Sequence, residues 1–496
     1  MKGTMLAGVR WLLKHNNNSK KFRLNASSSV AGGIGRSCYD CIPNIRTFSS
    51  SSSVREGCDD GVGGYVMSFG DGNQGALGLP SSSMGIGAGG GGDAYEPTKI
   101  TGLPSDDITC IGAGHYHSLS VTSHGDVWSW GRNNEFQLGR DSFDVPSRDS
   151  WSKPEMVQGL SQVRVKAVYA SGVVSTAIGE DGSLWVWGKS RRGQLGLGKG
   201  ITDSPLPSRV EALAGEHIVK VSLGWGHTLA LTNDGRLFGW GYSADGRLGH
   251  IGMSLENMSM SPQILGASTL VETQGTTSSL EVAEKLVLEQ MQKENDMPII
   301  WEPCLLQELN GVQVSDVACG LDHSLVLCCN GVLLSGGNNT YGQLGRGKED
   351  SSGLSPVDMS FQPLSISSGL GHSLAVCQQI SSSQEVMGGD VSGTGIASWG
   401  WNGNSQLGRS GPENVPKLVE GLEEETPLFV SGGRVHSVAL TSKGGVWVWG
   451  CGKNGRLGLG SSIDEVEPAL IEDLEGVKVL QIASGFDHNL LLVVNQ

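Results

Sequence analysis

Six histidines share one short motif and are the residues of this chain best suited to acid–base or metal chemistry. In each copy a glycine stands three residues before the histidine, and Ser, Thr or Asn follows it. The histidines are His117, His227, His323, His372, His436 and His488. A neutral imidazole can bind a metal ion or transfer a proton near neutral pH. The copies recur at intervals of about 50 residues or more. We therefore expect them to be spread over the fold, each holding a strand turn by hydrogen bonding.

Other patterns typical of catalytic or cofactor sites do not occur in the sequence. It has no HExxH, GxSxG or P-loop pattern, which are the arrangements of zinc proteases, serine hydrolases and nucleotide phosphate sites. The ten cysteines are not spaced as zinc ligands, and the one CxxC pair, Cys38 and Cys41, lies near the N-terminus. No apolar run approaches the ~18 residues of a membrane span. We predict a protein that is not an enzyme, with no cofactor, no metal and no membrane span.

The elements that carry these histidines are short strands joined by tight turns. In residues 436–460, β-forming residues alternate on both sides of Lys443-Gly444-Gly445, which is a hairpin signal. Trp447 and Trp449 are two residues apart, so both point to one face of their strand. A second signature, an aromatic residue and Gly followed by Leu-Gly, recurs with the first. Its copies begin at Phe69, Trp130, Trp187, Trp240, Trp399 and Trp449, with Gly336 as a degenerate copy. We expect the tryptophans to pack between neighbouring units.

Counting the copies predicts an all-β, seven-bladed β-propeller. Each signature occurs seven times if Ser175 is taken to replace His in Gly172–Thr176 and Asn489 is allowed after His488. A unit near 50 residues fits one four-stranded blade. The first aromatic-Gly signature, at Phe69, has no histidine motif before it, and the last histidine motif, at His488, has no aromatic-Gly signature after it. We therefore expect the N-terminal strand to complete the last blade and close the ring. The predicted units are 63–124, 125–180, 181–233, 234–329, 330–380, 394–442 and 444–496.

The repeats resemble those of the regulator of chromosome condensation family. GHYHS with DVWSWGRNNEFQLG, and GWGHT with RLFGWGYSADGRLG, are two of the matching copies, and the resemblance covers residues 63–496. The resemblance implies a seven-bladed propeller closed by a shared blade. It does not by itself assign a function, because one fold serves many functions.

Residues 1–48 differ in composition from the rest of the chain. They hold eight basic residues and one acidic residue, and they are rich in serine. This composition is typical of an organelle transit peptide, and Arg46 before Phe48 and Ser49 resembles a mitochondrial cleavage site. We expect cleavage between Phe48 and Ser49, a flexible linker over 49–62, and a mitochondrial location, most simply the matrix. The alternative is a disordered basic tail on a nuclear or cytosolic protein.

The charge balance argues against a chromatin-binding function. The whole chain has a formal net charge of −15, and removing residues 1–48 changes it to −22. Such a surface repels phosphate backbones unless basic residues cluster, and the clusters are small, such as Lys189, Arg191 and Arg192. We expect partner proteins, indirect contact with RNA, and no binding to chromatin.

One long insertion, residues 251–302, interrupts the repeats. From Ser278 to Asn295 its sequence predicts a helix, with a capping box at Ser278 and Glu281. Leu280, Val287 and Met291 lie on one stripe of that helix. The stripe is either a partner-binding face or part of a surface decoration. A shorter insertion, 378–393, is predicted to be disordered.

Three functions remain open. Mitochondrial members of the resembling family imply a scaffold for organellar RNA processing, such as transcript splicing, and for respiratory-complex biogenesis. The family's namesake implies guanine-nucleotide exchange on a small GTPase. A plant member implies an ultraviolet photoreceptor, which depends on clustered Trp in GWRHT motifs. Only Gly224-Trp225-Gly226-His227-Thr228 comes close, so we reject that function. The other copies have His115, Val173, Leu321, Leu370, Arg434 and Phe486 where Trp225 stands.

Overall fold

The structure, a computed structural model, describes residues 63–80, 85–86, 92–105, 107–141, 152–251, 297–347, 353–378, 393–474 and 476–495. Within these ranges the regular elements are strands and short 3-10 helices, and there is no α-helix. The predicted transit peptide with its Phe48–Ser49 cleavage site, the linker 49–62 and the helix 278–295 with Leu280, Val287 and Met291 lie outside the described residues.

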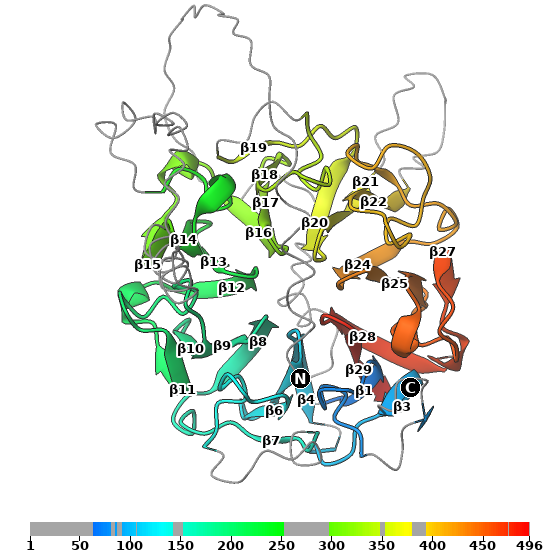
Figure 1. The fold of residues 1–496 in the computed structure, drawn as a ribbon, viewed down its shortest axis with the longest axis horizontal. Helices are drawn as coiled ribbons and strands as arrows, with labels where there is room; N and C mark the ends of the chain where they lie inside the picture. Colours follow the sequence, from blue (N-terminus) through cyan, green and yellow to red (C-terminus); the bar gives the residue numbers. More distant parts are fainter. Residues whose placement is uncertain are drawn as a thin grey trace, which may run out of the picture. The chain divides into compact units, whose positions relative to one another are not determined.

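The strands form seven antiparallel sheets arranged as the blades of a ring (Figure 1). The first three blades in the chain are β4 (Ile108–Ala113) to β7 (Glu155–Met156), β8 (Val165–Ser171) to β11 (Asp203–Arg209), and β12 (Ile218–Leu223) to β15 (Ile299–Leu305). Their middle strands are β5 (His117–Thr122), β6 (Val127–Gly131), β9 (Val174–Gly179), β10 (Leu184–Lys189), β13 (His227–Thr232) and β14 (Leu237–Tyr242). These blades confirm the predicted all-β propeller.

The next three blades have the same strand order. They run from β16 (Val314–Cys319) to β19 (Ser355–Pro356), from β20 (Gln362–Ser368) to β23 (Lys417–Leu418), and from β24 (Pro427–Gly432) to β27 (Glu465–Leu470). Their middle strands are β17 (His323–Cys328), β18 (Leu333–Gly337), β21 (His372–Gln378), β22 (Thr394–Gly400), β25 (His436–Thr441) and β26 (Val446–Gly450).

The seventh blade combines the two ends of the described chain. Its strand order is β2–β3–β1–β29–β28, with β1 (Tyr65–Gly70), β2 (Gly85–Ile86), β3 (Gly92–Lys99), β28 (Val477–Ser484) and β29 (His488–Asn495). β1 pairs with β29 from Tyr65 opposite Val493 to Gly70 opposite His488. The predicted closure by the N-terminal strand is confirmed. The sequence signatures did not reveal that β3 joins the same blade beside β1.

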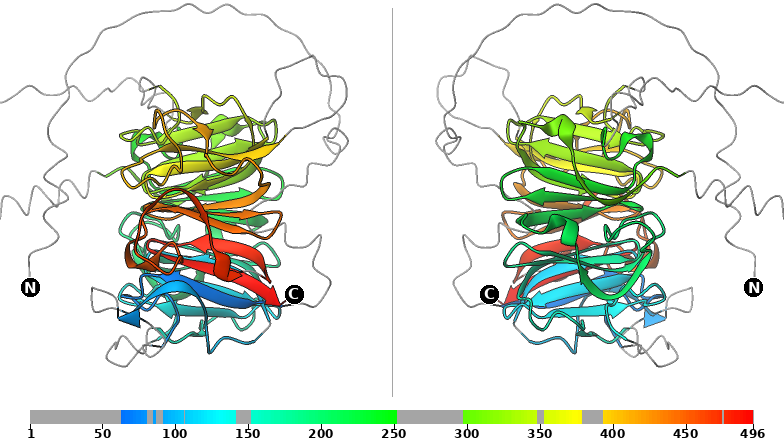
Figure 2. Two further views of the ribbon diagram at one scale, coloured as in Figure 1. Left: turned by 90° about the vertical axis from the view of Figure 1, so that its right-hand side faces the viewer. Right: turned by 90° about the vertical axis from the view of Figure 1, so that its left-hand side faces the viewer.

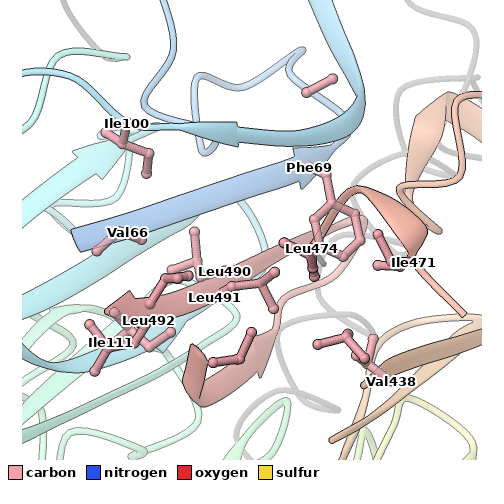
Figure 3. Close-up of a cluster of buried hydrophobic side chains, with 14 of the residues drawn as sticks. Val66, Phe69, Ile100, Ile111, Val438, Ile471, Leu474, Leu490, Leu491 and Leu492 are labelled. Carbon is pink, nitrogen blue, oxygen red and sulfur yellow. The ribbon is translucent and has the colours of Figure 1, made fainter. Parts of the chain in front are cut away.

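A cluster of buried side chains fills this closing blade (Figure 3). Val66 and Phe69 of β1 pack with Leu490 and Leu492 of β29, and all four are almost fully buried. In the edge-on views, the N-terminal strands in blue lie against the C-terminal strands in red (Figure 2). The first and last described strands are therefore held together by a hydrophobic core as well as by strand pairing.

The second strand of each blade is covered on both faces, which explains its composition. β5, β9, β13, β17 and β25 are buried at every position. Since each blade lies between two others, a polar side chain there needs a hydrogen-bond partner from a neighbouring blade. The third strand usually ends in Gly. Gly131, for example, has a φ of 105°, and a Cβ added to it would lie 2.5 Å from the Tyr116 carbonyl oxygen.

Polar contacts also join the innermost strands of three blades. Lys220 of β12 forms a buried ion pair with Asp316 of β16. Asp316 also accepts hydrogen bonds from the backbone N–H of Val317 at 2.8 Å and of Ile366, in β20, at 3.3 Å. Because a buried carboxylate is stabilised only when it is fully partnered, Asp316 fixes the spacing of these blades.

Candidate functional site

The repeated histidines form hydrogen bonds between blades, as the contacts of His372 illustrate. Its Nε2 lies 3.0 Å from Ser437 Oγ on the next blade. Ser437 Oγ donates at 2.9 Å to the backbone carbonyl of Gln406, which lies in a loop of the histidine's own blade. Trp449 Nε1 donates to the same carbonyl, also at 2.9 Å. We call this set of contacts an inter-blade latch: an imidazole, a polar side chain of the next blade and a shared loop carbonyl.

Six of the seven blade interfaces contain such an imidazole. The pairs are His117–Ser175 at 2.7 Å, His227–Ser324 at 2.8 Å, His323–Ser373 at 3.0 Å, His372–Ser437 at 3.0 Å, His436–Asn489 at 3.0 Å and His488–Ser118 at 3.0 Å. Trp130, Trp187, Trp240, Trp399 and Trp449 each donate Nε1 to the loop carbonyl of the preceding blade, at 2.8 to 3.0 Å. The structure thus places every repeated His and Trp between blades and brings none of the histidines together as one site.

The geometry fixes which ring nitrogen of His436 carries the proton. Asn489 Nδ2 donates to the Arg456 carbonyl at 2.8 Å, so its Oδ1 must accept a hydrogen from His436 Nε2. Where a serine donates its only proton to a carbonyl, the imidazole facing it must likewise donate from Nε2. Nδ1 of His436 is then an unprotonated nitrogen, buried without a hydrogen-bond partner.

Burial holds all six imidazoles in the neutral form. It lowers the pKa to about 3 for His117, His372 and His436, and to about 4 for His323 and His488. For His227, burial and the nearby Arg247 lower the pKa well below 6.5. A fully buried imidazole with this pKa is unable to exchange a proton with a substrate near neutral pH, so the latches are structural contacts.

The glycine of each histidine motif is required by the imidazole beneath it. A Cβ added to Gly114 would lie 2.4 Å from Cε1 and 2.7 Å from Nδ1 of His117. We predict that Gly114→Ser lowers the free energy of unfolding by about 2–3 kcal/mol, because the ring has no room to move. Denaturant unfolding of the single variant measures this loss.

Replacing the imidazole as well provides the matched control for Gly114→Ser. In the double variant Gly114→Ser, His117→Val the clash is gone. We expect the combined loss to be smaller than the sum of the single losses by about 2 kcal/mol. Additive losses would show that the glycine is needed for another reason.

The natural chain already contains this double replacement at one blade. In β9, Ser175 pairs with Trp187 and Val174 with Gly188, whereas in β5 Ser118 pairs with Trp130 and His117 with Gly131. The prediction that Ser175 replaces histidine is therefore wrong by one residue. Val174 stands in the histidine position and Ser171 in the glycine position, where no imidazole excludes a Cβ. Likewise Gly172, not Val173, corresponds to Trp225.

The turns between the first and second strands meet around the central channel of the ring. Backbone hydrogen bonds link the turns of successive blades: Trp225 N–H to Leu321 O at 3.1 Å, Leu321 N–H to Leu370 O at 3.0 Å, and Arg434 N–H to Phe486 O at 3.1 Å. The innermost strands and these turns line a hollow of about 250 Å³. We call its rim, formed by the residues at the Trp225-equivalent positions, the channel mouth.

Aromatic side chains occupy one side of the channel mouth. His115 stacks on Trp225, with ring centroids 5.0 Å apart, and lies 4.5 Å from the ring of Phe486. The Arg434 guanidinium lies 4.7 Å from the Phe486 ring and forms an ion pair with Asp487. Leu321 and Leu370 line the hollow as well. Within the described ranges the ring partner of Trp225 is His115 and no other Trp, so this part of the chain shows no tryptophan cluster at the mouth.

The sequence identified the residues at the Trp225-equivalent positions but did not show that they form a channel mouth, and it did not reveal the loop carbonyls of the latches. The mouth residues differ from blade to blade, so no repeated pattern marks them. The carbonyls belong to the residue before each Leu-Gly, a position that the second signature does contain. Among the described residues, no three His, Cys, Asp or Glu side chains form a group able to hold a metal ion. Nor does any helix in the described ranges have the length and hydropathy to cross a membrane.

Comparison with known proteins agrees with this geometry. The model of the RCC1-like domain family matches residues 65–491. Ultraviolet-B receptor UVR8 of Arabidopsis thaliana is 29% identical over an alignment of 419 positions that covers 83% of this chain and 78% of that protein. RCC1 domain-containing protein RUG3, mitochondrial, also of Arabidopsis thaliana, is 26% identical over an alignment of 500 positions that covers 95% of this chain and 81% of that protein.

A solved structure shows the same fold. Yeast RCC1 (Prp20), bound to Kap60, superposes with a TM-score of 0.67 at 19% identity, covering 94% of this chain and 97% of that one. Since the family model spans nearly all of the described propeller, the resemblance seen in the repeats is confirmed, and the chain belongs to the RCC1-like domain family.

Proposed function

We propose that this protein is a non-enzymatic mitochondrial scaffold whose propeller binds proteins of organellar RNA processing, such as transcript splicing, and of respiratory-complex biogenesis. The observation that carries the proposal is the latch. All six repeated histidines are buried between blades, where they hydrogen-bond to the next blade. The groups best suited to acid–base chemistry therefore serve to hold the ring together. We therefore expect partners to contact the loops that connect the strands, because these loops tolerate variation without loss of the fold.

The proposed location has two supports of different kinds. Residues 1–48 have the basic, serine-rich composition of a transit peptide. RUG3, which is similar over 95% of this chain, carries the word mitochondrial in its name. Cleavage between Phe48 and Ser49 leaves a mature chain with a formal charge of −22. That charge favours partner proteins over direct RNA contact for the bulk of the surface.

Affinity purification from isolated mitochondria tests the proposal. The full chain, with a tag at its C-terminus, is expressed in cells and recovered from the organelle, and its N-terminus, bound proteins and bound RNA are identified. We expect a chain that begins at or near Ser49 and is enriched in splicing or assembly factors. A mock purification with the tag on an unrelated mitochondrial protein is the control.

Two outcomes would contradict the proposal. An intact Met1 together with a nuclear location would remove the mitochondrial part. A small GTPase recovered without RNA-processing factors, and released by added GTP, would instead favour nucleotide exchange.

A further inference from the structure

The turn between β8 and β9 leaves a gap in the channel mouth. Gly172 provides no side chain there, and a Cβ added to it would meet no atom within 4 Å. His115 of one neighbouring blade and Trp225 of the other meet across the gap, with ring planes inclined by 25°. Trp225 is 43% exposed. The stack therefore presents an aromatic surface to solvent, held in place from both sides of the blade.

Two arginines of the blade β8–β11 follow its third strand, and one of them, Arg192, packs close to the residue after Trp225. Arg191 and Arg192 lie in the loop that follows β10, and Arg191 is exposed. The side chain of Arg192 crosses the backbone of Gly226, where an added Cβ would lie 2.5 Å from Arg192 Cδ. Its guanidinium lies 5.3 Å from the Tyr242 ring. Gly226 directly follows Trp225, so a cation is fixed next to the exposed indole.

These two cations are uncompensated within the part of the chain that the structure describes. The ion pairs there involve other arginines, for example Arg132 with Glu135 and Arg164 with Glu180, and none involves Arg191 or Arg192. The whole chain has a formal net charge of −15. Two arginines without an ion pair, one of them held over the Tyr242 ring, therefore bring positive charge to this side of an acidic chain.

We propose that the surface formed by His115, Trp225, Arg191 and Arg192 binds single-stranded nucleic acid. An unpaired base stacks on the indole of Trp225, and the neighbouring phosphates contact the two guanidinium groups, which is how proteins bind single strands with little sequence preference. A duplex is excluded because its base faces are already covered. His115 supports the indole as a neutral ring, since burial lowers the pKa of His115 to about 3. This direct contact goes beyond the proposed scaffold function and does not depend on it.

Fluorescence anisotropy on the full chain tests the site. The probes are a labelled 12-nucleotide RNA of mixed sequence, the same sequence as DNA, and an RNA duplex, each at two salt concentrations. We expect Trp225→Ala to weaken single-strand binding by about 10- to 100-fold, the range of one lost base stack, and Trp225→Phe to retain most of it. Arg191→Gln with Arg192→Gln should flatten the dependence of log affinity on log salt by about 1.4, or 0.7 for each lost phosphate contact.

Trp401→Ala is the matched control. Trp401 is a half-buried tryptophan that follows β22 and lies 5.6 Å from the Tyr341 ring on other blades, and we expect its removal to leave binding unchanged. Equal binding of RNA and DNA supports the stacking site, and preference for RNA supports it with the ribose hydroxyl as an added contact.

Three results would overturn the site: unchanged binding in Trp225→Ala, equal losses in Trp401→Ala, or equal binding of the duplex. Loss of a co-purified protein from Trp225→Ala with unchanged RNA affinity would identify the surface as a protein-docking site instead. Because the assay needs no organelle and no partner, its failure is separate from failure of the proposed scaffold function.

Discussion

Deleting Tyr65–Gly70 is expected to abolish the single cooperative unfolding transition of the propeller. These six residues form β1, which pairs with β29 on one side and β3 on the other. Without β1, the inner half of the closing blade has an open edge, and β3 has no strand to join. The buried side chains of Val66 and Phe69 are lost as well, each of which contributes about 1.5–3 kcal/mol through burial. Differential scanning calorimetry of the full-length chain measures the effect.

A point variant separates loss of the closure from poor folding of a shortened chain. Phe69 is fully buried, and an added Cβ on Gly458 of the preceding blade would lie 2.9 Å from its ring. Phe69→Ala should cost about 3–5 kcal/mol and keep one transition, because the strand pairing remains. If the deletion variant melts at the same temperature as the parent chain, closure through β1 does not stabilise the ring.

Acidification from pH 7 to pH 5 is expected to destabilise the propeller far more than titration of surface groups would. The folded-state pKa of each latch imidazole lies well below 6.5 because of burial. An unfolded histidine takes up its proton near pH 6.5. Between these values the unfolded chain binds more protons, so stability is lost as the pH falls. For a folded pKa of about 3, as in His117, the loss at pH 5 is about 2 kcal/mol for each imidazole.

Proton uptake on unfolding checks the cause of this acid sensitivity. Calorimetric unfolding at pH 5.5 in buffers of different ionisation enthalpy should show uptake of several protons. The variant Gly114→Ser, His117→Val copies the natural Ser171 and Val174 arrangement and removes one imidazole, so its uptake should be lower by about one proton. Carboxylates such as Asp181, whose pKa is lowered by its hydrogen bonds to Ser183, lose most of their contribution below about pH 4, the unfolded-state pKa of Asp. A melting temperature that is constant from pH 7 to pH 5 would contradict the neutral, buried latch.

The repeats predicted the ring because blade formation depends on local patterns that recur in phase. The alternation of apolar residues and the Trp-Gly strand ends predicted the blades. Phe69 has no histidine motif before it and His488 has no aromatic-Gly signature after it, which was sufficient to predict β1 beside β29. The pattern could not place β3, since Gly92–Lys99 carries no copy of either signature. Nor could counting residues reveal that Val174, rather than Ser175, faces Gly188, because a one-residue shift is visible only in strand pairing.

The candidate nucleic-acid surface could not be predicted from the sequence, for a different reason. Arg191 and Arg192 were visible as a small basic cluster, and Trp225 as a departure from the repeat. Their association depends on the ring curvature, which brings His115 and Trp225 together over an intervening blade. Contacts between residues so distant in the chain follow from tertiary structure and leave no local pattern.

The shared blade also sets the order of events during synthesis. β1 is among the first strands of the ring to be made, whereas its partner β29 lies at the other end of the described chain, with Gly70 opposite His488. At roughly 5–20 residues per second, a nascent β1 waits tens of seconds with one hydrogen-bonding edge unfilled. During translation, the early blades can stack on one another while the ring stays an open arc. A chaperone that covers this one edge would therefore protect the chain until its last strand arrives.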